Sequence, residues 1–573
     1  MRGGFYPHLN EISALRDVIL FQLVPRQRKH LPGNLQERIE HGVFDDSQKA
    51  AIRGAMQAKD IYCIQGPPGT GKTTIICEII DLIVSEFRQQ ETQAGELAEH
   101  RGFMGINGHF QIQNVNLRPQ FRNHRTPVLV SAFTNRAVDN IVAKLLRDYP
   151  DIKVVRLGSP ESIRDQAVMS QVLENLAKSN FQFADGTSEK VDSPQIAQMI
   201  LNTVDVVATT STTAGGALCQ QMCFHAAIID EAGQITEPSA LIPATLASKT
   251  ILVGDQAQLP PVVETKNAVT LRLEETHVLK QIGLEPRGSY AISLFERLMA
   301  KWEGTVHSSL LRYQYRMNSE IAHIASELFY QGQIQTGGGP DVANQHVGQF
   351  LEQFGVNTRE ISNPDPKIFA EEWPVVFVDT CKLGTWDSIT QGNKRQVSKY
   401  NTKEAQIVAR CVGALVEACE NTDPFPMELI AGVGIIAAYR AQVREITNQI
   451  QLYLENSLGI PSSAVINILG QLEIDTVDRF QGREKEIVLI SFVESNERHK
   501  IGLITAETRR FNVSLTRAKK KAILIGNSET LTVENKGERK KVKDAKKTFQ
   551  KLLQILREKH AIITLGGKIS SVP

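Results

Sequence analysis

The sequence predicts an α/β protein with two tandem domains, each built on a parallel sheet. Two series of short, β-branched apolar runs indicate this fold, one between Ile61 and Val253 and the other between Val375 and Ile525. Helical patterns separate the runs, and continuous apolar strands that alternate with helices are typical of parallel sheets covered on both faces. The chain of 573 residues is long enough for two large domains of this kind.

The expected elements follow one another in a regular order. Helix starts are marked by Asp46-Ser47, which opens a helix through Met56, and by Ser293–Glu296 and Asn401–Glu404, which have the spacing of a capping box. The apolar runs predict strands at 61–64, 128–130, 204–207, 227–229 and 250–253 in the first series, and at 375–378, 433–436, 487–490 and 522–525 in the second.

These elements divide the chain into four parts. We expect an N-terminal segment over 1–44, a first domain over 45–306, a second domain over 307–530 and a basic C-terminal tail over 531–573. Three segments depart from the alternation of strands and helices because they are polar or rich in Gly and Pro, and we interpret them as insertions or long loops: 88–127, 160–200 and 333–370.

The composition excludes several classes of protein. No run approaches the ~18 apolar residues that a membrane span needs, and the ordinary residue usage excludes collagen-like and low-complexity chains. The seven cysteines are too few and too irregularly spaced for a disulfide framework. This cysteine usage favours a reducing compartment, so we expect the protein in the nucleus or the cytoplasm.

The net charge of +1 conceals an uneven distribution. Residues 536–559 carry ten Lys and Arg against three acidic residues, a net +7, which leaves −6 for the rest of the chain. Three interpretations of this basic tail stay open: a solvated Lys-rich helix or disordered end, an arm that binds nucleic acid, and a nuclear-import signal around Arg539–Lys547.

A phosphate-binding loop follows the first predicted strand. Glycines allow backbone N–H groups to approach phosphate oxygens, and the N-terminus of the next helix adds its dipole. Lys72 is expected to reach the β- and γ-phosphates, and the Thr73 hydroxyl to bind Mg²⁺. The predicted nucleotide-binding residues of the loop are Gly66, Pro67, Pro68, Gly69, Thr70, Gly71, Lys72, Thr73 and Thr74.

An acidic pair ends the predicted strand at 227–229. Carboxylates at the end of a buried strand are costly unless they meet a cation. Asp230 therefore suits Mg²⁺ binding, and Glu231 suits the role of base for the attacking water. Together with Lys72, this pair indicates a nucleoside triphosphate hydrolase.

Three further residues are candidates for sensing or stabilising the transferred phosphate. Gln258 lies in a polar turn that ends in two prolines, where it can sense the γ-phosphate. Arg316 and Arg517 lie among apolar or small residues, where a buried guanidinium needs an anion. Each arginine is either an arginine finger or the partner of a structural carboxylate.

The order of the motifs resembles that of the superfamily 1 helicases, most closely the up-frameshift/senataxin-like branch. The resemblance covers about Phe44 to Asn527 and rests on motifs in family order: Ser47-Gln48, the phosphate-binding loop, Ser131–Asp139, Asp230–Gln234, Gly254–Pro260, Ser293–Arg297, Gln314–Met317, Thr476–Glu486 and Asn512–Ala518. It implies two tandem RecA-like P-loop NTPase domains with parallel sheets, plus insertions and the basic C-terminal tail.

The resemblance also implies roles for individual residues. Gln48 would read the adenine edge, Tyr315 would stack on the adenine, and Glu484 would hold the ribose. Arg316 and Arg517 would act as arginine fingers supplied by the second domain.

Contacts with nucleic acid are expected from polar residues that follow strands. Hydroxyls, amides and backbone N–H groups bind phosphates without reading the base sequence, although a Thr-rich run is also common in ordinary strand-end loops. The candidates are Thr134, Asn135, Thr209 and Thr210 in the first domain, and Thr476 and Arg479 in the second.

We therefore expect an ATP-dependent RNA/DNA helicase that uses ATP and Mg²⁺ and moves along single-stranded RNA or DNA, 5′ to 3′ by resemblance. We expect a monomeric motor that has adaptor or ribonucleoprotein partners and does not bind a membrane. Only 47 residues precede Gln48, too few for the accessory barrel that this branch usually has there. The alternatives are a ribonucleoprotein remodeller that unwinds little duplex and a non-hydrolysing P-loop scaffold.

Overall fold

Two parallel sheets organise the computed structural model, one in each of two units. The structure describes residues 18–19, 23–99, 126–163, 165–180, 197, 200–262, 292–361, 364–383, 389–391, 398–419, 424–480 and 482–565. The first unit is formed by described residues within Met1–Pro67, Gly71–Gln256 and Pro260–Leu311, and the second by those within Pro68–Thr70, Ala257–Leu259 and Arg312–Pro573. This architecture confirms the predicted α/β fold class.

The first sheet has seven parallel strands in the order β3-β4-β2-β5-β6-β1-β7. Its strands are β1 (Ile61–Gln65), β2 (Thr126–Ala132), β3 (Val154–Arg156), β4 (Val206–Thr210), β5 (Phe224–Asp230), β6 (Ala247–Gly254) and β7 (Ser308–Leu310). Its helices are α2 (Gly33–His41), α3 (Asp46–Gln57), α4 (Lys72–Glu99), α5 (Asn135–Asp148), α6 (Gln166–Ser170), α7 (Leu173–Asn180), α9 (Ser211–Ala214), α10 (Ala217–Gln220), α11 (Glu237–Ala244) and α13 (Leu294–Trp302).

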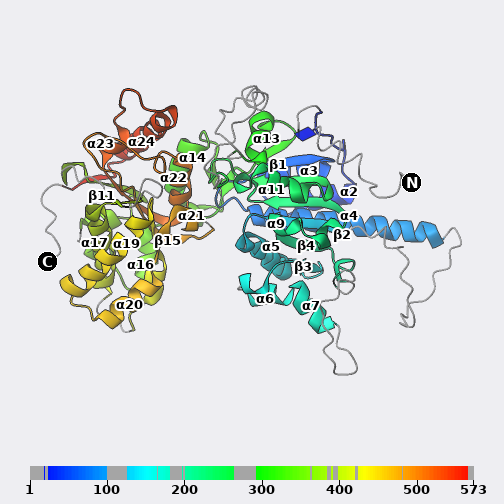
Figure 1. Cartoon of the computed structure of the whole chain (residues 1–573), viewed down its shortest axis with the longest axis horizontal. Coiled ribbons are helices and arrows are strands. Elements are labelled where there is room, and N and C mark those ends of the chain that lie inside the picture. Colours follow the sequence, from blue (N-terminus) through cyan, green and yellow to red (C-terminus); the bar gives the residue numbers. More distant parts are fainter. Residues whose placement is uncertain are drawn as a thin grey trace. The chain divides into compact units, whose positions relative to one another are not determined.

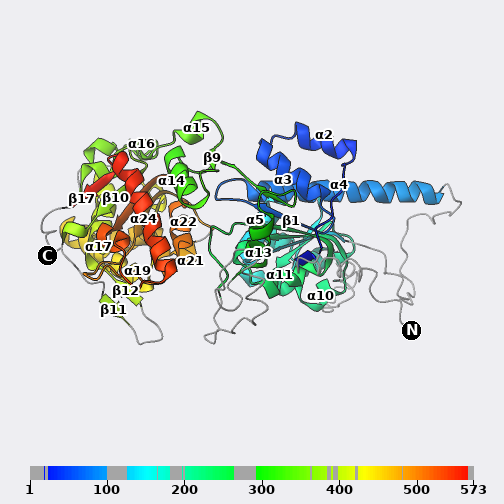
Figure 2. The same cartoon turned by 90° about the horizontal axis from the view of Figure 1, so that it is seen from above.

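Helices cover both faces of this sheet (Figures 1 and 2). Apolar residues of α3, α4 and α5 pack on one face, and those of α11 and α13 pack on the other. Every residue of β1 is buried, which is why the strand reads as a continuous apolar run rather than an alternating one.

The second sheet has six parallel strands in the order β14-β13-β15-β16-β10-β17. Its strands are β10 (Val375–Asp379), β13 (Val433–Ala437), β14 (Glu473–Thr476), β15 (Lys485–Ser491), β16 (Ala518–Gly526) and β17 (Ile562–Thr564), with small sheets formed by β8 (Tyr313–Gln314) with β9 (Gln335–Thr336) and by β11 (Ile389–Gln391) with β12 (Ser398–Tyr400). Its helices are α14 (Ser319–Phe329), α15 (Pro340–Ala343), α16 (Val347–Glu352), α17 (Thr402–Ala418), α18 (Met427–Ala431), α19 (Arg440–Leu452), α20 (Ser462–Gln471), α21 (Val477–Phe480), α22 (Thr508–Leu515), α23 (Ser528–Thr532) and α24 (Lys540–Glu558).

One strand falls on the other side of the domain boundary expected at 306/307. The strand β7 pairs with β1 in parallel, with Ile64 opposite Ser309, and so completes the first sheet. A strand of three residues, Ser308–Leu310, is too short to give a clear apolar pattern.

The segments expected to be insertions or long loops contain helix. In the first, α4 continues to Glu99, and 100–125 lie outside the described residues. The second contains α6 and α7, with 181–196 outside the described residues. In the third, α16 buries Val347, Phe350 and Leu351 in the second unit's core, so a short i, i+3, i+4 pattern was missed among Gly and Pro residues.

The basic segment at the C-terminal end is part of the second unit rather than an appended tail. One face of α24, with Phe549, Leu552 and Leu556, is buried in the core, and β17 pairs with β10 at the sheet edge. Several of its cations meet carboxylates: Lys541 with Glu507 (2.7 Å), Lys546 with Glu538 (2.6 Å), Lys551 with Glu327 (2.9 Å) and Lys559 with Glu320 (3.2 Å). The pairs with Glu507, Glu327 and Glu320, which lie outside 536–559, neutralise part of the +7 charge within the fold.

No helix among the described residues is long and apolar enough to cross a membrane.

Replacing Phe549 tests whether α24 belongs to the core. The Phe549 ring lies 5.3 Å from that of Phe492 and 5.7 Å from that of Phe511, measured between centroids. The substitution Phe549→Ala should lower the free energy of unfolding by ~3–5 kcal/mol, because it leaves a cavity among aromatic rings. Urea-induced unfolding followed by circular dichroism measures the change.

The matched control is Lys547→Ala, an exposed position on the same helix, which should change the free energy of unfolding by less than ~0.5 kcal/mol. If Phe549→Ala lowered the free energy of unfolding as little as Lys547→Ala does, α24 would not be part of the core.

Candidate active site

The phosphate-binding loop connects β1 to α4 at the carboxyl edge of the first sheet. Gly69 and Gly71 have φ values of +77° and +81°, which L side chains rarely adopt, so glycine is required at both positions. The helix begins at Lys72, whose ammonium group donates to the Gly66 carbonyl oxygen at 2.6 Å. Thr73 and Thr74 are partly exposed in the first helical turn. Glycine turns before a helix N-terminus form an anion-binding site.

The acidic pair lies at the same edge, because all strands of the sheet are parallel. Asp230 is the last residue of β5, and β6 lies between β5 and β1 in the sheet. Backbone groups bring the turns together: the Gly66 N–H donates to the Gly254 carbonyl oxygen at 2.9 Å, and a Cβ added to Gly254 would lie 2.8 Å from the Gly233 nitrogen. Only glycine permits this approach between the turns that follow β5 and β6.

Burial dominates the electrostatics of Asp230, which is 5% exposed. Desolvation, and after it the neighbouring Glu231, raises the pKa of its carboxyl to about 7 against the opposing effects of Lys72 and the Glu231 N–H. That N–H donates to Asp230 Oδ1 at 2.8 Å. A buried carboxylate with so little compensation suits a divalent cation, and its oxygen donors fit Mg²⁺.

Glu231 adopts a conformation that non-glycine residues seldom use. Its φ of +53° and ψ of +32° lie in the left-handed region, which costs of order 1 kcal/mol and often marks a functional position. Gln234 Nε2 donates to Glu231 Oε2 at 2.6 Å and so fixes the carboxylate. Gln234 is a site residue that the sequence-based assignment did not include, although it belongs to the same acidic motif.

Gln48 has a structural role in addition to the expected adenine contact. Asp45 caps α3, and the two residues form a capping box: the Gln48 N–H donates to Asp45 Oδ1 (2.9 Å), and the Asp45 N–H donates to Gln48 Oε1 (3.2 Å). A Cβ added to Gly71 would lie 2.8 Å from Gln48 Nε2, so this amide nitrogen borders the phosphate-binding loop. The helix cap thus orients Gln48 towards the loop.

The second unit holds the other predicted nucleotide-site residues. Arg316 Nε lies 2.5 Å from Glu484 Oε2, and Lys519 Nζ lies 2.9 Å from Glu484 Oε1. Burial by itself would raise the pKa of Glu484, but Arg316 and Lys519 outweigh it and lower the pKa below its ordinary value. Sequence reasoning missed Lys519, because a lysine in a basic run has no distinguishing pattern.

The loop around Arg316 is held by a buried amide. Gln314 Oε1 accepts hydrogen bonds from the backbone N–H groups of Arg316 (2.9 Å) and Met317 (2.7 Å). Tyr315 is 39% exposed, and a Cβ added to Gly337 would lie 2.5 Å from its ring. An exposed aromatic ring held over a glycine backbone suits stacking on a base.

Arg517 and Gln258 are both buried. Arg517 Nε donates to the Val513 carbonyl oxygen (3.1 Å) and Nη1 donates to the Arg483 carbonyl oxygen (3.2 Å). Gln258 belongs to the second unit by its contacts. The role of each as a phosphate sensor or finger stays a prediction.

The predicted nucleic-acid contacts differ in their surroundings. Thr134 and Thr210 are N-caps, of α5 and α9 respectively, while Thr476 ends β14 and Arg479 is exposed. The assignment of Thr209 is corrected: its side chain is fully buried, and its hydroxyl donates to the Leu157 carbonyl oxygen at 3.1 Å, so it cannot bind a phosphate.

Asn135 has a partner within the fold. Its Oδ1 accepts a hydrogen bond from Arg156 Nη2 at 2.8 Å.

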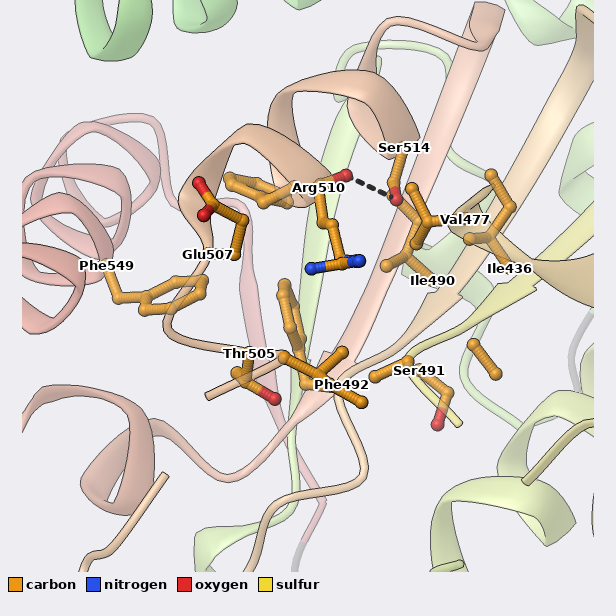
Figure 3. A pocket seen from close by; sticks show the side chains of 14 residues that line it. Ile436, Val477, Ile490, Ser491, Phe492, Thr505, Glu507, Arg510, Ser514 and Phe549 are labelled. Atoms are coloured by element: carbon orange, nitrogen blue, oxygen red, sulfur yellow. Dashed lines mark hydrogen bonds between the residues drawn. The ribbon is translucent and has the colours of Figure 1, made fainter. Parts of the chain in front are cut away.

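A small pocket in the second unit lies at the carboxyl ends of β13 and β15 (Figure 3). Apolar side chains including Ile436, Phe492 and Phe549 line it, and Arg510 points into it. Its cavity of about 30 Å³ has room for about one water molecule, far less than a nucleotide needs. We therefore interpret this pocket as a packing feature of the core.

Comparisons with known proteins agree with this geometry. Two family models, both described as AAA domain, match the chain, one over residues 43–193 and 178–266 and the other over residues 290–529. The chain belongs to the DNA2/NAM7-like superfamily 1 helicases. The family models cover the motifs of both units, from Gln48 to Arg517.

Curated relatives in this family include archaeal and eukaryotic proteins. An uncharacterized ATP-dependent helicase of Methanocaldococcus jannaschii is 29% identical, and the match covers 91% of this chain and 74% of that protein. The DNA replication ATP-dependent helicase/nuclease DNA2 of Bos taurus is 28% identical over 90% of this chain and 40% of its own length. The Saccharomyces cerevisiae protein of that name is 29% identical over 85% of this chain and 26% of its own length. The chain therefore spans less than half of these two eukaryotic relatives.

The two functions of Gln48 can be separated by substitution. Gln48→Glu retains an oxygen for the capping box but removes the amide donor beside Gly71, whereas Gln48→Ala removes both. We expect Gln48→Ala to lower the free energy of unfolding by ~0.5–2 kcal/mol, while Gln48→Glu leaves it nearly unchanged. Both should weaken adenine-nucleotide binding, measured by calorimetric titration of ATP.

Tight ATP binding by Gln48→Glu would show that the amide does not contact the base. Binding of GTP provides the internal control, because a lost adenine contact should narrow the preference for ATP over GTP.

Proposed function

We propose that the protein is an ATP-hydrolysing helicase that acts on single-stranded RNA or DNA. The observation that carries this proposal is the buried Asp230 carboxylate beside Lys72 at the end of a phosphate-binding loop. A buried carboxylate, a lysine and a helix N-terminus together fit a nucleoside triphosphate with a divalent cation. The names of the relatives support the same activity.

Each residue of the candidate site would have its own role in ATP hydrolysis. Lys72 and the loop N–H groups would bind the phosphates, and Thr73 and Asp230 would hold Mg²⁺, which neutralises charge on the phosphate oxygens when bound. Glu231, fixed by Gln234, would accept the proton of the attacking water. Arg316 and Arg517 would stabilise the charge of the transition state, and Gln258 would sense the γ-phosphate.

Arg316 would have to exchange its partner Glu484 for a phosphate during the cycle. Glu484 would then be available to a ribose hydroxyl. This exchange gives the Arg316–Glu484 pair a role in both binding and release.

Single-stranded nucleic acid would bind through Thr134 and Thr210 in the first unit and through Thr476 and Arg479 in the second. Few of these groups are charged, so binding would involve many weak contacts with the phosphate backbone. Movement from 5′ to 3′, a monomeric motor, adaptor or ribonucleoprotein partners, and a nuclear or cytoplasmic location are part of the proposal that rests on resemblance.

The substitution Glu231→Gln tests the hydrolytic step. It should bind ATP with near-normal affinity but hydrolyse it at least ~10²-fold more slowly, because the amide cannot accept a proton. Steady-state phosphate release in the presence of single-stranded oligonucleotide measures the rate, and calorimetric titration measures ATP binding.

The matched control is Glu303→Gln, an exposed position in the same unit that should leave both quantities unchanged. Turnover by Glu231→Gln within a few-fold of the unsubstituted protein would remove Glu231 as the base. Absence of any nucleic-acid-stimulated turnover in the unsubstituted protein would favour a non-hydrolysing scaffold instead.

A competition experiment identifies the strand on which the protein acts. Single-stranded RNA and DNA of equal length and sequence are titrated against each other at fixed salt, with ATP hydrolysis as the readout. A fluorescent partial duplex, with and without a bound protein block, then distinguishes duplex unwinding from removal of proteins.

A further inference from the structure

A fully buried arginine lies at the end of β3 and is not part of the nucleotide site. The side chain of Arg156 has no exposed surface. Its Nε donates to Asp139 Oδ1 at 2.9 Å, its Nη2 donates to Asn135 Oδ1 at 2.8 Å, and its Nη1 donates to the Leu157 carbonyl oxygen. A buried guanidinium is tolerated only when its nitrogens have acceptors, and each of the three nitrogens has one here.

The acceptors belong to elements that meet at the carboxyl edge of the first sheet. Asn135 is the first residue of α5, and Asp139 follows one turn later. The Leu157 carbonyl oxygen also accepts a hydrogen bond from Thr209 Oγ1 in β4, at 3.1 Å. One guanidinium therefore connects the ends of β3 and β4 to the first turn of α5.

The chain after β3 encloses the guanidinium. A Cβ added to Gly158 would lie 2.9 Å from Arg156 Nη1, so the backbone at this glycine packs directly against the charged group. Arg156 cannot reach a bound ligand from this position, and any effect on binding has to pass through its partners.

The helix α5 has other anchors along its length. Val138, Ile141, Val142 and Leu145 are buried in the core of the first unit. Arg156 acts only on the first turn, where the exposed side chains of Phe133, Thr134 and Arg136 surround the helix N-terminus. These exposed side chains and N–H groups are suited to contacts with phosphates.

We propose that Arg156 is a positioning residue that sets the orientation of the first turn of α5 for binding the backbone of single-stranded nucleic acid. Asn135 then acts by holding Arg156 rather than by touching a phosphate. This inference rests on the proposed function, because it assumes that the turn binds nucleic acid. Lysine cannot replace Arg156, since a single ammonium group cannot reach acceptors on both sides of a planar fork.

The first test is Arg156→Lys in the full chain. Binding of fluorescein-labelled oligo(dT) and oligo(U) is measured by anisotropy at one fixed salt concentration. We expect about 10-fold weaker binding and ATP affinity within about 2-fold, because the apolar anchors of α5 stay in place. The thermal unfolding midpoint should fall, because buried acceptors lose their donors, so binding is measured well below that midpoint. The control Arg147→Lys, an exposed position at the other end of α5, should bind normally.

A double-mutant cycle distinguishes positioning from direct contact. Asn135→Ala combined with Arg156→Lys should weaken binding no more than the stronger single substitution, because both break the same connection. Asn135→Asp, which keeps an acceptor for Arg156, should bind close to normally. This comparison of Asn135→Ala with Asn135→Asp remains decisive if Arg156→Lys fails to fold.

Unchanged binding by Arg156→Lys, additive effects in the cycle, or weakened binding by Asn135→Asp equal to that of Asn135→Ala would each overturn the inference. Absence of oligonucleotide binding by the unsubstituted protein would overturn the proposed function, and this inference with it.

Discussion

Ionisable groups lie where the strands of a parallel sheet end, and this constraint determines what the first unit can do. Parallel strands bring all their carboxyl ends to one edge, so residues far apart in the sequence meet there. In this protein the edge carries a buried carboxylate, Asp230, whose pKa is raised to about 7 mainly by loss of solvent. In the proposed function, a divalent cation would compensate for this unfavourable group.

Other features of the site support that carboxylate. The contact between Gly233 and Gly254 brings the turns after β5 and β6 together, and glycine at Gly71 leaves room for Gln48. Glu231 is held in a left-handed conformation, with its carboxylate bonded to Gln234. The strained backbone and the close glycine contact both lie in the turns after β5 and β6. Backbone strain is often found at functional sites.

In the second unit, a partly buried carboxylate is stabilised by paired cations instead. Glu484 lies between Arg316 and Lys519, which lower its pKa and keep it ionised. The basic helix α24 and its C-cap residue are accommodated in the same way, because Lys541, Lys551 and the C-cap Lys559 meet carboxylates of the second unit. Charge therefore gives little indication of a ligand in this unit until its partners are known.

Sequence reasoning predicted the long strands and the phosphate-binding loop well, because a buried parallel strand such as β1 has an unbroken apolar pattern. Short strands were missed: β7 and β17 have three residues each and depend on their neighbours for stability. The helix α24 was interpreted as a tail because its lysines obscured the apolar face around Phe549.

Within the site, sequence reasoning identified residue types but not their partners. Buried contacts decide whether a polar residue faces a ligand or the fold, as the burial of Thr209 and the bond between Asn135 and Arg156 illustrate. No local pattern encodes such contacts, because the partners come from strands and helices that meet only in the folded sheet.

The most direct test of this account is the dependence of ATP affinity on Mg²⁺, compared between the unsubstituted protein and Asp230→Asn by calorimetric titration. We predict that Mg²⁺ tightens ATP binding to the unsubstituted protein by about 10-fold or more. It should have little effect on ATP binding to Asp230→Asn, because the neutral amide has no negative charge with which to hold the cation. An equal effect of Mg²⁺ on both proteins would contradict the claim that this buried carboxylate forms the cation site.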